Sequence, residues 1–370
     1  MASRPFDGWA GWAGWADEEC RAVAAAGRWR TVRTDDAKPA TTFASNDYLG
    51  LSQHPAVIAA AHEALDRWGA GAGSARLVAG ARSVHAELEA ELADWKGTEA
   101  ALLFPTGYAA NLGVLTTFAP PDGRILSDER NHASIVDGCR LARAEVAVYD
   151  HGDVSHVADL LAADTTGRPT VVVTDTVFSM DGDVAPVDKL ARLCADHGAL
   201  LVLDEAHAVL GPHPELDADL ECVRVGTLSK TLGSVGGFVA GSRRHVELLV
   251  NRARSFIFTT APAPADSAAA LAALRVLRSP EGDHLTARLR RHVTAVAGPA
   301  HPSPIVPVVL GDEQAAVDAS AALAARGLVV PAIRPPTVAP GTSRLRVSLS
   351  AAHTDEQVAR LTEALRALAS

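Results

Sequence analysis

The chain reads LLVLDEAH at residues 200–207, where an apolar run is followed at once by a carboxylate and then by an imidazole. A short continuous apolar run of this kind is typical of a buried strand in a parallel sheet. Asp204 is therefore expected at the carboxyl end of a strand, at the edge where open α/β sheets bind their ligands. His207 is expected on the loop that follows.

A second polar group follows another strand-like run further along the chain. Residues 222–225 read CVRV, and GTLSKT follows at 226–231. A lone loop lysine is usually solvated, but Lys230 shares the predicted sheet edge with Asp204 and His207. A lysine in a closed apolar site loses its proton more easily and can form a Schiff base with an aldehyde. An amine, a carboxylate and an imidazole are together the groups that hold and activate pyridoxal phosphate (PLP).

Further apolar runs extend the predicted sheet. They lie at residues 101–104, 146–149, 170–174 and 237–240, separated by helical patterns. Strands that alternate with helices predict an α/β fold with a mostly parallel sheet covered on both faces. The texture changes after about residue 275, and a smaller α/β domain is expected there. We therefore predict a leader at 1–42, a large PLP-binding domain at 43–275 and a small C-terminal domain at 276–370.

The letters DEAH also occur in helicases, which is the competing interpretation. That function requires a phosphate-binding loop of the form GxxxxGK[ST]. The nearest candidate is RVGTLSKT at 224–231, where Arg224 and Ser229 occupy the two glycine positions. The run GAGAGS at 69–74 likewise lacks the third glycine of a dinucleotide-binding fingerprint. Neither nucleotide-binding interpretation is supported.

The composition favours a soluble enzyme that acts on small molecules. The 370 residues are 48% hydrophobic and carry a net charge of -10, so no basic surface for nucleic acid is expected. The four cysteines form no C-x-x-C pair, and neither a metal site nor a disulfide framework is expected. The N-terminus lacks a signal-peptide pattern, and no apolar run approaches the ~20 residues that span a membrane. We expect a cytoplasmic protein.

Several other side chains could complete the site. Residues 104–111 read FPTGYAAN, a strand followed through glycine by a helix whose N-terminus could bind phosphate. His132 could stack on an aromatic cofactor, and Ser179, just past the strand at 170–174, could reach the same ring. Each residue taken alone is more commonly structural.

Two arginines and a tryptophan stripe leave alternatives open. Arg344 and Arg346 are two apart on a predicted strand, so they point the same way, and one of them could bind a substrate carboxylate. For Arg344 a surface position is favoured. The leader carries Trp9, Trp12 and Trp15 at helical spacing. Packing on the rest of the protein is favoured for this stripe over substrate gating or partner docking.

Six motifs, in order, give the chain a resemblance to a known family. They are NDYLGL at 46–51, TGY at 106–108 with Asn111, HAS at 132–134, FSMDG at 178–182, DEAH at 204–207 and TLSK at 227–230. In order and spacing they resemble the α-oxoamine synthases, a family of fold-type I PLP enzymes. The resemblance covers nearly all of the chain after about residue 43. Within the family, IRPPTV at 333–338 and SRLR at 343–346 are most similar to the branch that makes 8-amino-7-oxononanoate for biotin.

The resemblance implies roles for individual residues. Lys230 would form the Schiff base and remove the α-proton of the amino acid, Asp204 would pair with the pyridine nitrogen and His132 would stack on the ring. The implied catalytic residues are Lys230, His132, Asp204 and His207. The other implied cofactor contacts are Gly107, Tyr108, Ser179 and Thr227, with Thr259 and Thr260 reaching the phosphate from the partner subunit. The implied substrate contacts are Asn46, Thr337, Arg346 and, in the leader, Arg21.

The implied reaction is a decarboxylative condensation. L-Alanine would react with a pimeloyl thioester of CoA or acyl carrier protein, giving 8-amino-7-oxononanoate, CO2 and the free thiol, in a homodimer with shared active sites. One alternative is a related synthase that uses glycine, serine or a different acyl thioester. Another is a non-catalytic PLP-binding interaction protein, because residues 208–214, AVLGPHP, depart from the glycine-rich run of the family. Acyl-chain access is expected to differ near that loop.

Overall fold

The structure, a computed structural model, describes residues 11–30, 32, 41–214, 216–217 and 219–369. The chain forms two compact units. The larger contains residues 45–306 and 348–362, and the smaller contains the described parts of 1–44, 307–347 and 363–370. Compactness does not test which segments fold independently, so the predicted division into residues 1–42, 43–275 and 276–370 stays a prediction.

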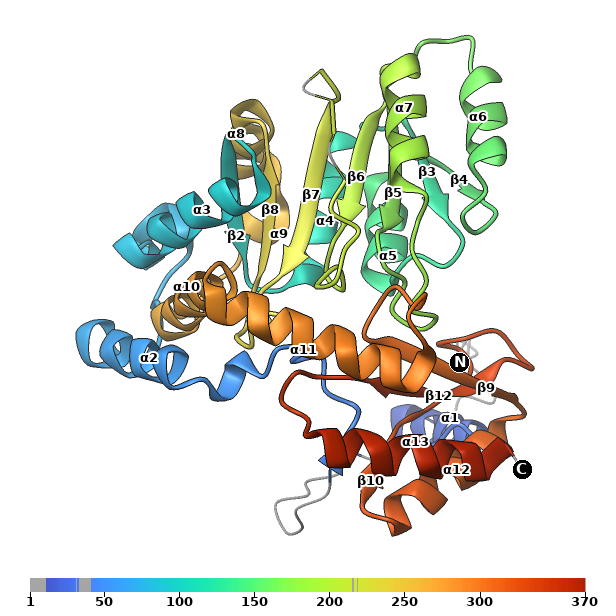
Figure 1. The fold of residues 1–370 in the computed structure, drawn as a ribbon. Helices are drawn as coiled ribbons and strands as arrows, with labels where there is room; N and C mark the ends of the chain where they lie inside the picture. The colour runs from blue at the N-terminus through green and yellow to red at the C-terminus, as the bar shows by residue number, and fades with distance from the viewer. Residues whose placement is uncertain (1–10, 31, 33–40, 215, 218, 370) are drawn as a thin grey trace, which may run out of the picture. The chain divides into compact units, whose positions relative to one another are not determined.

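A seven-stranded sheet organises the larger unit (Figure 1). Its strands are β2 (Ala100–Phe104), β3 (Arg124–Asp128), β4 (Glu145–Tyr149), β5 (Thr170–Asp175), β6 (Leu200–Asp204), β7 (Cys222–Thr227) and β8 (Gly237–Gly241). The order is β2-β8-β7-β6-β5-β3-β4, and only β8 runs antiparallel to its neighbours. The predicted α/β class with a mostly parallel sheet is confirmed. Strand β3, which reads RILSD, has too short an apolar run to be predicted from pattern alone.

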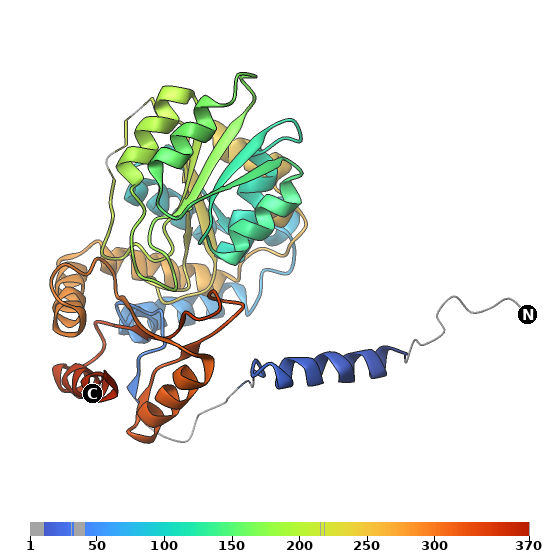
Figure 2. The same cartoon turned by 90° about the vertical axis from the view of Figure 1, so that its right-hand side faces the viewer.

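Alternation along the strands explains why both faces are covered. Val171 and Val173 pack into one apolar core and Val172 into the other, because successive side chains of a strand point to opposite faces. The helices over the first core are α4 (Gly107–Phe118), α5 (Ala133–Ala142), α8 (Arg243–Arg252) and α9 (Arg254–Ile257). Those over the second are α6 (Val154–Ala162) and α7 (Val187–His197). Figure 2 gives a second view of these layers.

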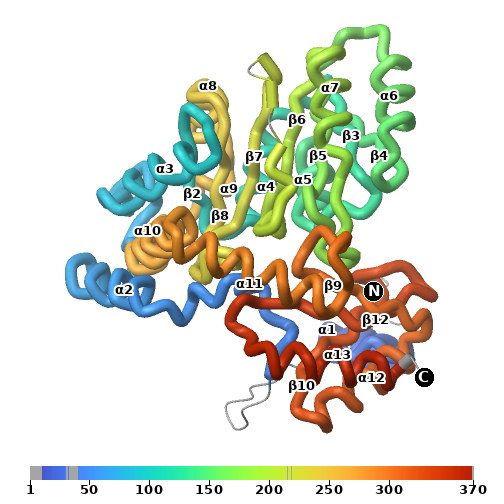
Figure 3. Tube along the Cα trace, viewed as in Figure 1, coloured from blue at the N-terminus to red at the C-terminus, as the bar shows by residue number. Residues whose placement is uncertain are grey.

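The larger unit contains further helices besides those that cover the two cores. They are η1 (Leu51–Gln53), α2 (Pro55–Trp68), η2 (Arg76–Gly80), α3 (Ser83–Lys96), α10 (Pro264–Leu277) and α11 (Pro280–Ala297). Helix α10 packs against both α2 and α3, which can be followed in the tube of Figure 3. Its buried side is rich in alanine, including Ala269, Ala270 and Ala273, and small side chains allow helices to approach closely.

The smaller unit contains short strands and two complete helices. Strand β1 (Thr41–Thr42) pairs in parallel with β10 (Leu328–Val329). A three-stranded sheet has the order β11-β12-β9, and β11 pairs antiparallel with β12. Its strands are β9 (Ile305–Gly311), β11 (Ala332–Ile333) and β12 (Ser343–Ser348), and the helices are α1 (Gly11–Ala25) and α12 (Glu313–Ala325). Helix α13 (Asp355–Ala369) is divided between the two units.

Helix α1 carries the part of the tryptophan stripe that the structure describes. The rings of Trp12 and Trp15 meet edge to face with their centroids 5.8 Å apart, as helical spacing predicts. Their exposed fractions are 75% and 46%, so neither ring is buried. Trp9 lies outside the described residues. In the described parts of the chain, every helix is too short or too polar to cross a bilayer.

Strand β8 packs closely against the start of α4 at Gly237. A Cβ built on Gly237 would lie 2.4 Å from the carbonyl carbon and oxygen of Thr106, which is backbone and cannot rotate away. We expect Gly237→Ala to lower the free energy of unfolding by about 1–3 kcal/mol through overpacking. Urea titration measures the effect. Gly71→Ala is the matched control, because a Cβ there meets nothing within 4 Å; equal losses in the two variants would contradict the steric argument.

Candidate active site

Two carboxyl groups end neighbouring strands of the sheet. Asp175 ends β5 and Asp204 ends β6, and the parallel register pairs these two residues directly. Thr176 continues the pairing by donating its N–H and its hydroxyl to the Asp204 carbonyl, at 2.8 and 2.9 Å. Both side chains are buried. The sheet therefore brings two acidic groups together at the predicted edge.

Asp204 is held by two donors from different parts of the fold. The Asn111 amide of α4 donates to Oδ2 at 2.7 Å, and the Ala206 N–H donates to Oδ1 at 2.9 Å. A carboxylate has about four acceptor positions, so each oxygen can still accept from a ligand. The carboxylate is thus fixed in direction and able to receive another N–H.

Asp175 has a different environment from Asp204. Burial raises its pKa well above the ordinary value, and the negative charge of Asp204 raises it further. The His132 N–H, which donates to Oδ2 at 2.8 Å, opposes this shift but does not reverse it. Two close carboxyl groups in a buried site do not both ionise readily. Burial beside Asp204 therefore disfavours the ionised form of Asp175.

His132 is linked to Asp204 through a chain of hydrogen bonds. Asn111 donates its second amide proton to the Ser134 hydroxyl at 2.9 Å, and this hydroxyl lies 2.8 Å from Nδ1 of His132. The Ser134 N–H also donates to Nδ1, at 3.2 Å. Because Nδ1 accepts, the ring proton of neutral His132 lies on Nε2. Partial burial lowers the pKa of His132, and the charge of Lys230 lowers it further, against the influence of Asp204.

Lys230 and His207 lie together as predicted. The Lys230 Nζ atom is 2.8 Å from Nε2 of His207, and the Tyr48 hydroxyl is 2.6 Å from the other ring nitrogen, Nδ1. Lys230 follows β7 and His207 follows β6, so parallel pairing of these strands brings the two loops together. An amine that touches an imidazole can exchange a proton with it.

The start of α4 forms a cradle beside Thr227. Thr106 caps the helix, its hydroxyl accepting from the Ala109 N–H at 3.0 Å. A Cβ on Gly107 would come 3.3 Å from the Cβ of Thr227, so glycine keeps this space open. The Thr227 hydroxyl donates to the Gly236 carbonyl at 2.9 Å. A helix N-terminus offers N–H groups and a favourable dipole to an anion, as phosphate binding requires.

These groups fit PLP. The cradle suits its phosphate, Asp204 suits its pyridine nitrogen, and Lys230 suits its aldehyde. Of the other predicted cofactor contacts, Tyr108 is exposed and donates its hydroxyl to Asp137, and Ser179 lies in the turn after β5.

The remaining predicted site residues are spread over both units. Thr259 and Thr260 follow α9 in the larger unit, and their predicted contact with a partner's phosphate stays a prediction. Asn46 accepts from the Tyr48 hydroxyl at 3.1 Å. Arg21, Thr337 and Arg346 belong to the smaller unit, and their substrate contacts also stay predictions. Arg344 is buried like Arg346, so the surface position favoured for it is wrong.

Sequence reasoning missed several residues of the site. Asp175 follows its apolar strand just as Asp204 does, and that signal could have identified it. Asn111 and Ser134 lie inside recognised motifs but had no predicted role, because their bonds join positions far apart in the chain. His151 lies on a loop without any motif.

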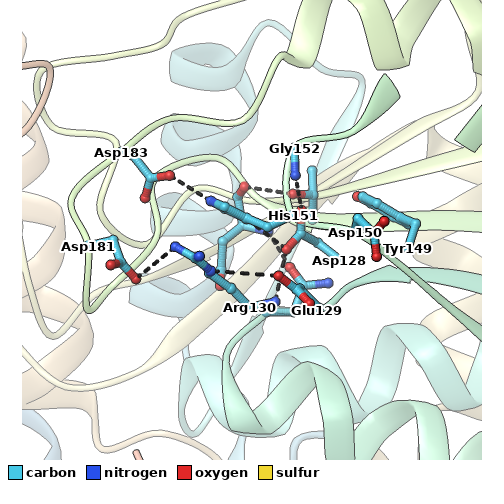
Figure 4. A network of polar contacts seen from close by, with 12 residues as sticks. Asp128, Glu129, Arg130, Tyr149, Asp150, His151, Gly152, Asp181 and Asp183 are labelled. Carbon is cyan, nitrogen blue, oxygen red and sulfur yellow. Dashed lines mark hydrogen bonds and ion pairs between the residues drawn. The ribbon is translucent and has the colours of Figure 1, made fainter. Parts of the chain in front are cut away.

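His151, which follows β4, connects the end of β3 with the loop after β5 (Figure 4). Its Nδ1 lies 3.0 Å from Asp128, the last residue of β3, and its Nε2 lies 2.6 Å from Asp183, after β5. The ring also packs edge-on against Phe178, with centroids 4.3 Å apart. Hydrogen bonds to Asp128 and Asp183 raise the pKa of His151 to about 9. The charged imidazole thus bridges the loops that carry His132 and Ser179.

A cavity of about 650 Å³ adjoins the loop at 208–214. Ala206, Thr227 and Thr231 belong to its wall, and the loop contributes Val209 and Leu210. The loop at 208–214 thus borders a cavity beside the segments that carry His207 and Lys230. Acyl access there stays a prediction.

The polar part of this wall contains a buried ion pair. Glu205 lies 2.6 Å from the Lys96 Nζ atom and accepts from Arg224 at 3.0 Å. Burial alone would raise the pKa of Glu205, but the two cations outweigh burial and leave the pKa lowered.

The hydrogen bonds of His151 to Asp128 and Asp183 predict that the free energy of unfolding depends on pH. Because its folded pKa of about 9 lies above the ordinary 6.5, its contribution is complete below pH 6.5 and is lost as pH rises through about 9. The difference in unfolding free energy between wild type and His151→Gln should therefore shrink from about pH 6 to about pH 10. Urea titrations across this range measure it. His62→Gln, an exposed change in α2, is the control; a difference independent of pH would contradict the bridge.

Comparisons with known proteins agree with this geometry. The chain matches the family "Aminotransferase class I and II" over residues 38–365. It is 54% identical to an 8-amino-7-oxononanoate synthase of Anaeromyxobacter dehalogenans, over 88% of this chain and 85% of the relative. It is 49% identical to an 8-amino-7-oxononanoate synthase of Alkalilimnicola ehrlichii, over 90% and 89%.

Solved structures are similar over most of their length. A serine palmitoyltransferase variant from S. paucimobilis with a bound PLP–myriocin aldimine superposes with a TM-score of 0.89, at 30% identity over 96% of each chain. An 8-amino-7-oxononanoate synthase from Francisella tularensis gives 0.73, at 26% identity over 88% of this chain and 96% of the other. The chain therefore belongs to the class I and II aminotransferase family of PLP-dependent enzymes and, within it, to the group of its 8-amino-7-oxononanoate synthase relatives.

Proposed function

We propose that the protein catalyses the condensation of L-alanine with a pimeloyl thioester, giving 8-amino-7-oxononanoate, CO2 and the free thiol. The observation that carries this proposal is the contact between Lys230 and His207. Lys230 lies on the loop after β7 and His207 on the loop after β6, the neighbouring strand that ends at Asp204. The named relatives support the choice of reaction. Such a reaction feeds biotin synthesis.

The cofactor would be held by groups that are already in position. The α4 N-terminus and Thr227 would bind its phosphate, Asp204 its pyridine nitrogen and Lys230 its aldehyde carbon. When bound, PLP supplies an electron sink that stabilises negative charge on the amino-acid carbon. Asp204 would hold the proton that makes the ring a strong sink, and the raised pKa of Asp175 disfavours a second anion beside it.

Proton transfer is assigned to Lys230. The Lys230 amine would accept the α-proton of alanine and later return a proton to the product. Its contact with His207 gives the amine a fixed direction. His132, whose lowered pKa keeps its ring neutral, can lie against the cofactor without adding positive charge. Asn46 and Arg346 are proposed to bind the alanine carboxylate.

Turnover by the purified protein tests the reaction. Loaded with PLP and given L-alanine and a pimeloyl thioester, it should release free thiol and form a product with the mass of 8-amino-7-oxononanoate. Lys230→Ala should lower kcat by at least about 100-fold, since it removes the acid–base group. Thiol release and mass spectrometry are the measurements. Thiol release by Lys230→Ala at the wild-type rate would contradict the assignment.

The same assay separates the alternatives. Glycine, serine and shorter or longer acyl thioesters are compared with alanine and the pimeloyl group. Preference for another pair would retain the family and replace the substrates. Absence of turnover with every pair, despite PLP binding, would favour the non-catalytic alternative. The contact between Lys230 and His207 supports the catalytic one.

We further propose that the protein works as a homodimer in the cytoplasm. Apolar side chains are exposed on η2 and after α9: Leu77, Val78 and Phe258 are 54%, 80% and 69% exposed. The Ala261 N–H donates to the Ser74 carbonyl at 3.0 Å, so the two segments are neighbours. An exposed apolar surface of this kind is typical of a subunit interface. The four cysteines are free, which supports a reducing compartment.

Shared active sites make a prediction for mixed dimers. If Thr259 and Thr260 serve the partner's site, a dimer of Lys230→Ala with the Thr259→Val/Thr260→Val double variant contains one complete site. Co-expressed and purified through two different tags, this mixed dimer should therefore be more active than either variant dimer. The thiol-release assay measures it. No gain over the more active variant would contradict sharing, and a monomer in sedimentation would contradict the dimer itself.

A further inference from the structure

Tyr48 is a fully buried tyrosine whose hydroxyl reaches the active site. Its exposed fraction is 0%, and its oxygen lies 2.6 Å from Nδ1 of His207, which is 159 residues away in sequence. A buried phenol needs a hydrogen-bond partner for its hydroxyl. Here that partner is the histidine whose other nitrogen contacts Lys230.

The loop that carries Tyr48 is fixed from several directions. The Asp47 carboxylate accepts from the N–H groups of Leu51 and Ser52, at 2.9 and 3.1 Å. The Ala351 N–H donates to the Tyr48 carbonyl at 2.8 Å, and the Ser350 hydroxyl donates to the Asp47 carbonyl at 2.7 Å. The phenol is therefore held in one position against His207.

The loop also packs tightly against the turn after Lys230. A Cβ on Gly233 would lie 2.3 Å from the backbone nitrogen of Ser52, and Gly233 has a φ of +60° that favours glycine. The Gly233 N–H donates to the Lys230 carbonyl at 3.0 Å. The turn of Lys230 and the loop of Tyr48 thus constrain each other.

The Tyr48 hydroxyl contacts two possible acceptors. It lies 3.1 Å from Oδ1 of Asn46, which can only accept, and 2.6 Å from Nδ1 of His207, whose role depends on the tautomer. Donation to Asn46 would leave the phenol oxygen to accept from His207 and would place the imidazole proton on Nδ1. Nε2 would then direct a lone pair at the Lys230 Nζ atom, 2.8 Å away.

We propose that Tyr48 is a positioning residue that holds His207 in the Nδ1–H tautomer, so that Nε2 accepts a hydrogen bond from Lys230. The proposal deepens the proposed function, on which it rests for the role of Lys230 as the base. With Nε2 as acceptor, an N–H of Lys230 is directed at the imidazole. With the opposite tautomer, a protonated Lys230 would face another N–H, and the contact would become repulsive.

Other charged groups also interact with Lys230, and their effects must be distinguished from the effect of the Tyr48 hydroxyl. The charge of Lys230 interacts with His132 and with Asp175, and both of these interact with Asp204. Tyr48→Phe leaves these groups in place and removes one oxygen. Any change in the proton distribution at His207 and Lys230 is then attributable to the phenol.

The tautomer can be observed directly. Full-length protein labelled with 15N-histidine, before PLP is added, should give the Nδ1–H form for His207, assigned by comparison with the His207→Gln spectrum. In Tyr48→Phe the signal should change to the Nε2–H form. With PLP bound, the pH at which the cofactor absorption changes should shift. In turnover assays kcat should fall by about tenfold, comparable with the loss when a group that orients a functional histidine is removed, with a smaller change in KM for alanine.

Tyr149→Phe is the matched control. Tyr149 is also buried, and its hydroxyl donates to the Val173 carbonyl rather than to a histidine. It should leave the His207 spectrum, the absorption midpoint and kcat unchanged. An Nε2–H form in the wild type would overturn the proposal, as would a Tyr48→Phe variant that matches Tyr149→Phe in every readout. The wild-type spectrum alone shows which His207 tautomer is present, even if Tyr48→Phe fails to fold. Neither spectrum requires turnover of a pimeloyl thioester, so a failure of the proposed reaction can be told apart from a failure of the tautomer proposal.

Discussion

Parallel pairing of β3, β5, β6 and β7 is the constraint on which the site depends. Parallel strands in register end at the same edge, so the segment after each of them starts from nearly the same place. His132, Asp175, Asp204 and Lys230 all follow or end these strands. No single motif needs to contain the whole site, because the sheet assembles it. The apolar alternation that buries both faces of the sheet is therefore also what positions the chemistry.

Burial and neighbouring charges then shift the pKa values of individual groups in different directions. Asp175 and Asp204 are paired residues of neighbouring strands, but burial and mutual repulsion raise the pKa of Asp175. Among the histidines, His132 has its pKa lowered, whereas His151 has its pKa raised to about 9 by hydrogen bonds to Asp128 and Asp183. Residue type alone does not give these states. They follow from how deeply the fold buries each group and from the charged and hydrogen-bonding partners that surround it.

The strands, the lysine and the Asp204–His207 pair could be predicted because their signals are local. An apolar run followed by Asp204 identifies both a strand and its end, and Lys230 follows the same pattern one strand later. Tyr48 could not be predicted, since its contact with His207 joins a loop between β1 and η1 to a loop in the middle of the chain. Asn111 and Ser134 lie within predicted motifs, yet their bonds to Asp204 and His132 depend on how α4 packs on the sheet. Arg344 was misjudged because strand position gives direction but not burial.

Two histidines of this site have opposite tautomers under the proposed arrangement. His132 accepts at Nδ1 from the Ser134 N–H and so carries its proton on Nε2, whereas His207 would donate from Nδ1 to Tyr48 and accept at Nε2. Each assignment is made by a neighbour that does not itself touch the reacting carbon. A donor is thereby available on one ring and an acceptor on the other, next to a lysine that must take up a proton and return it. Under the proposal, the Tyr48 hydroxyl and the Ser134 N–H would each fix one tautomer, so that the two imidazoles serve both purposes.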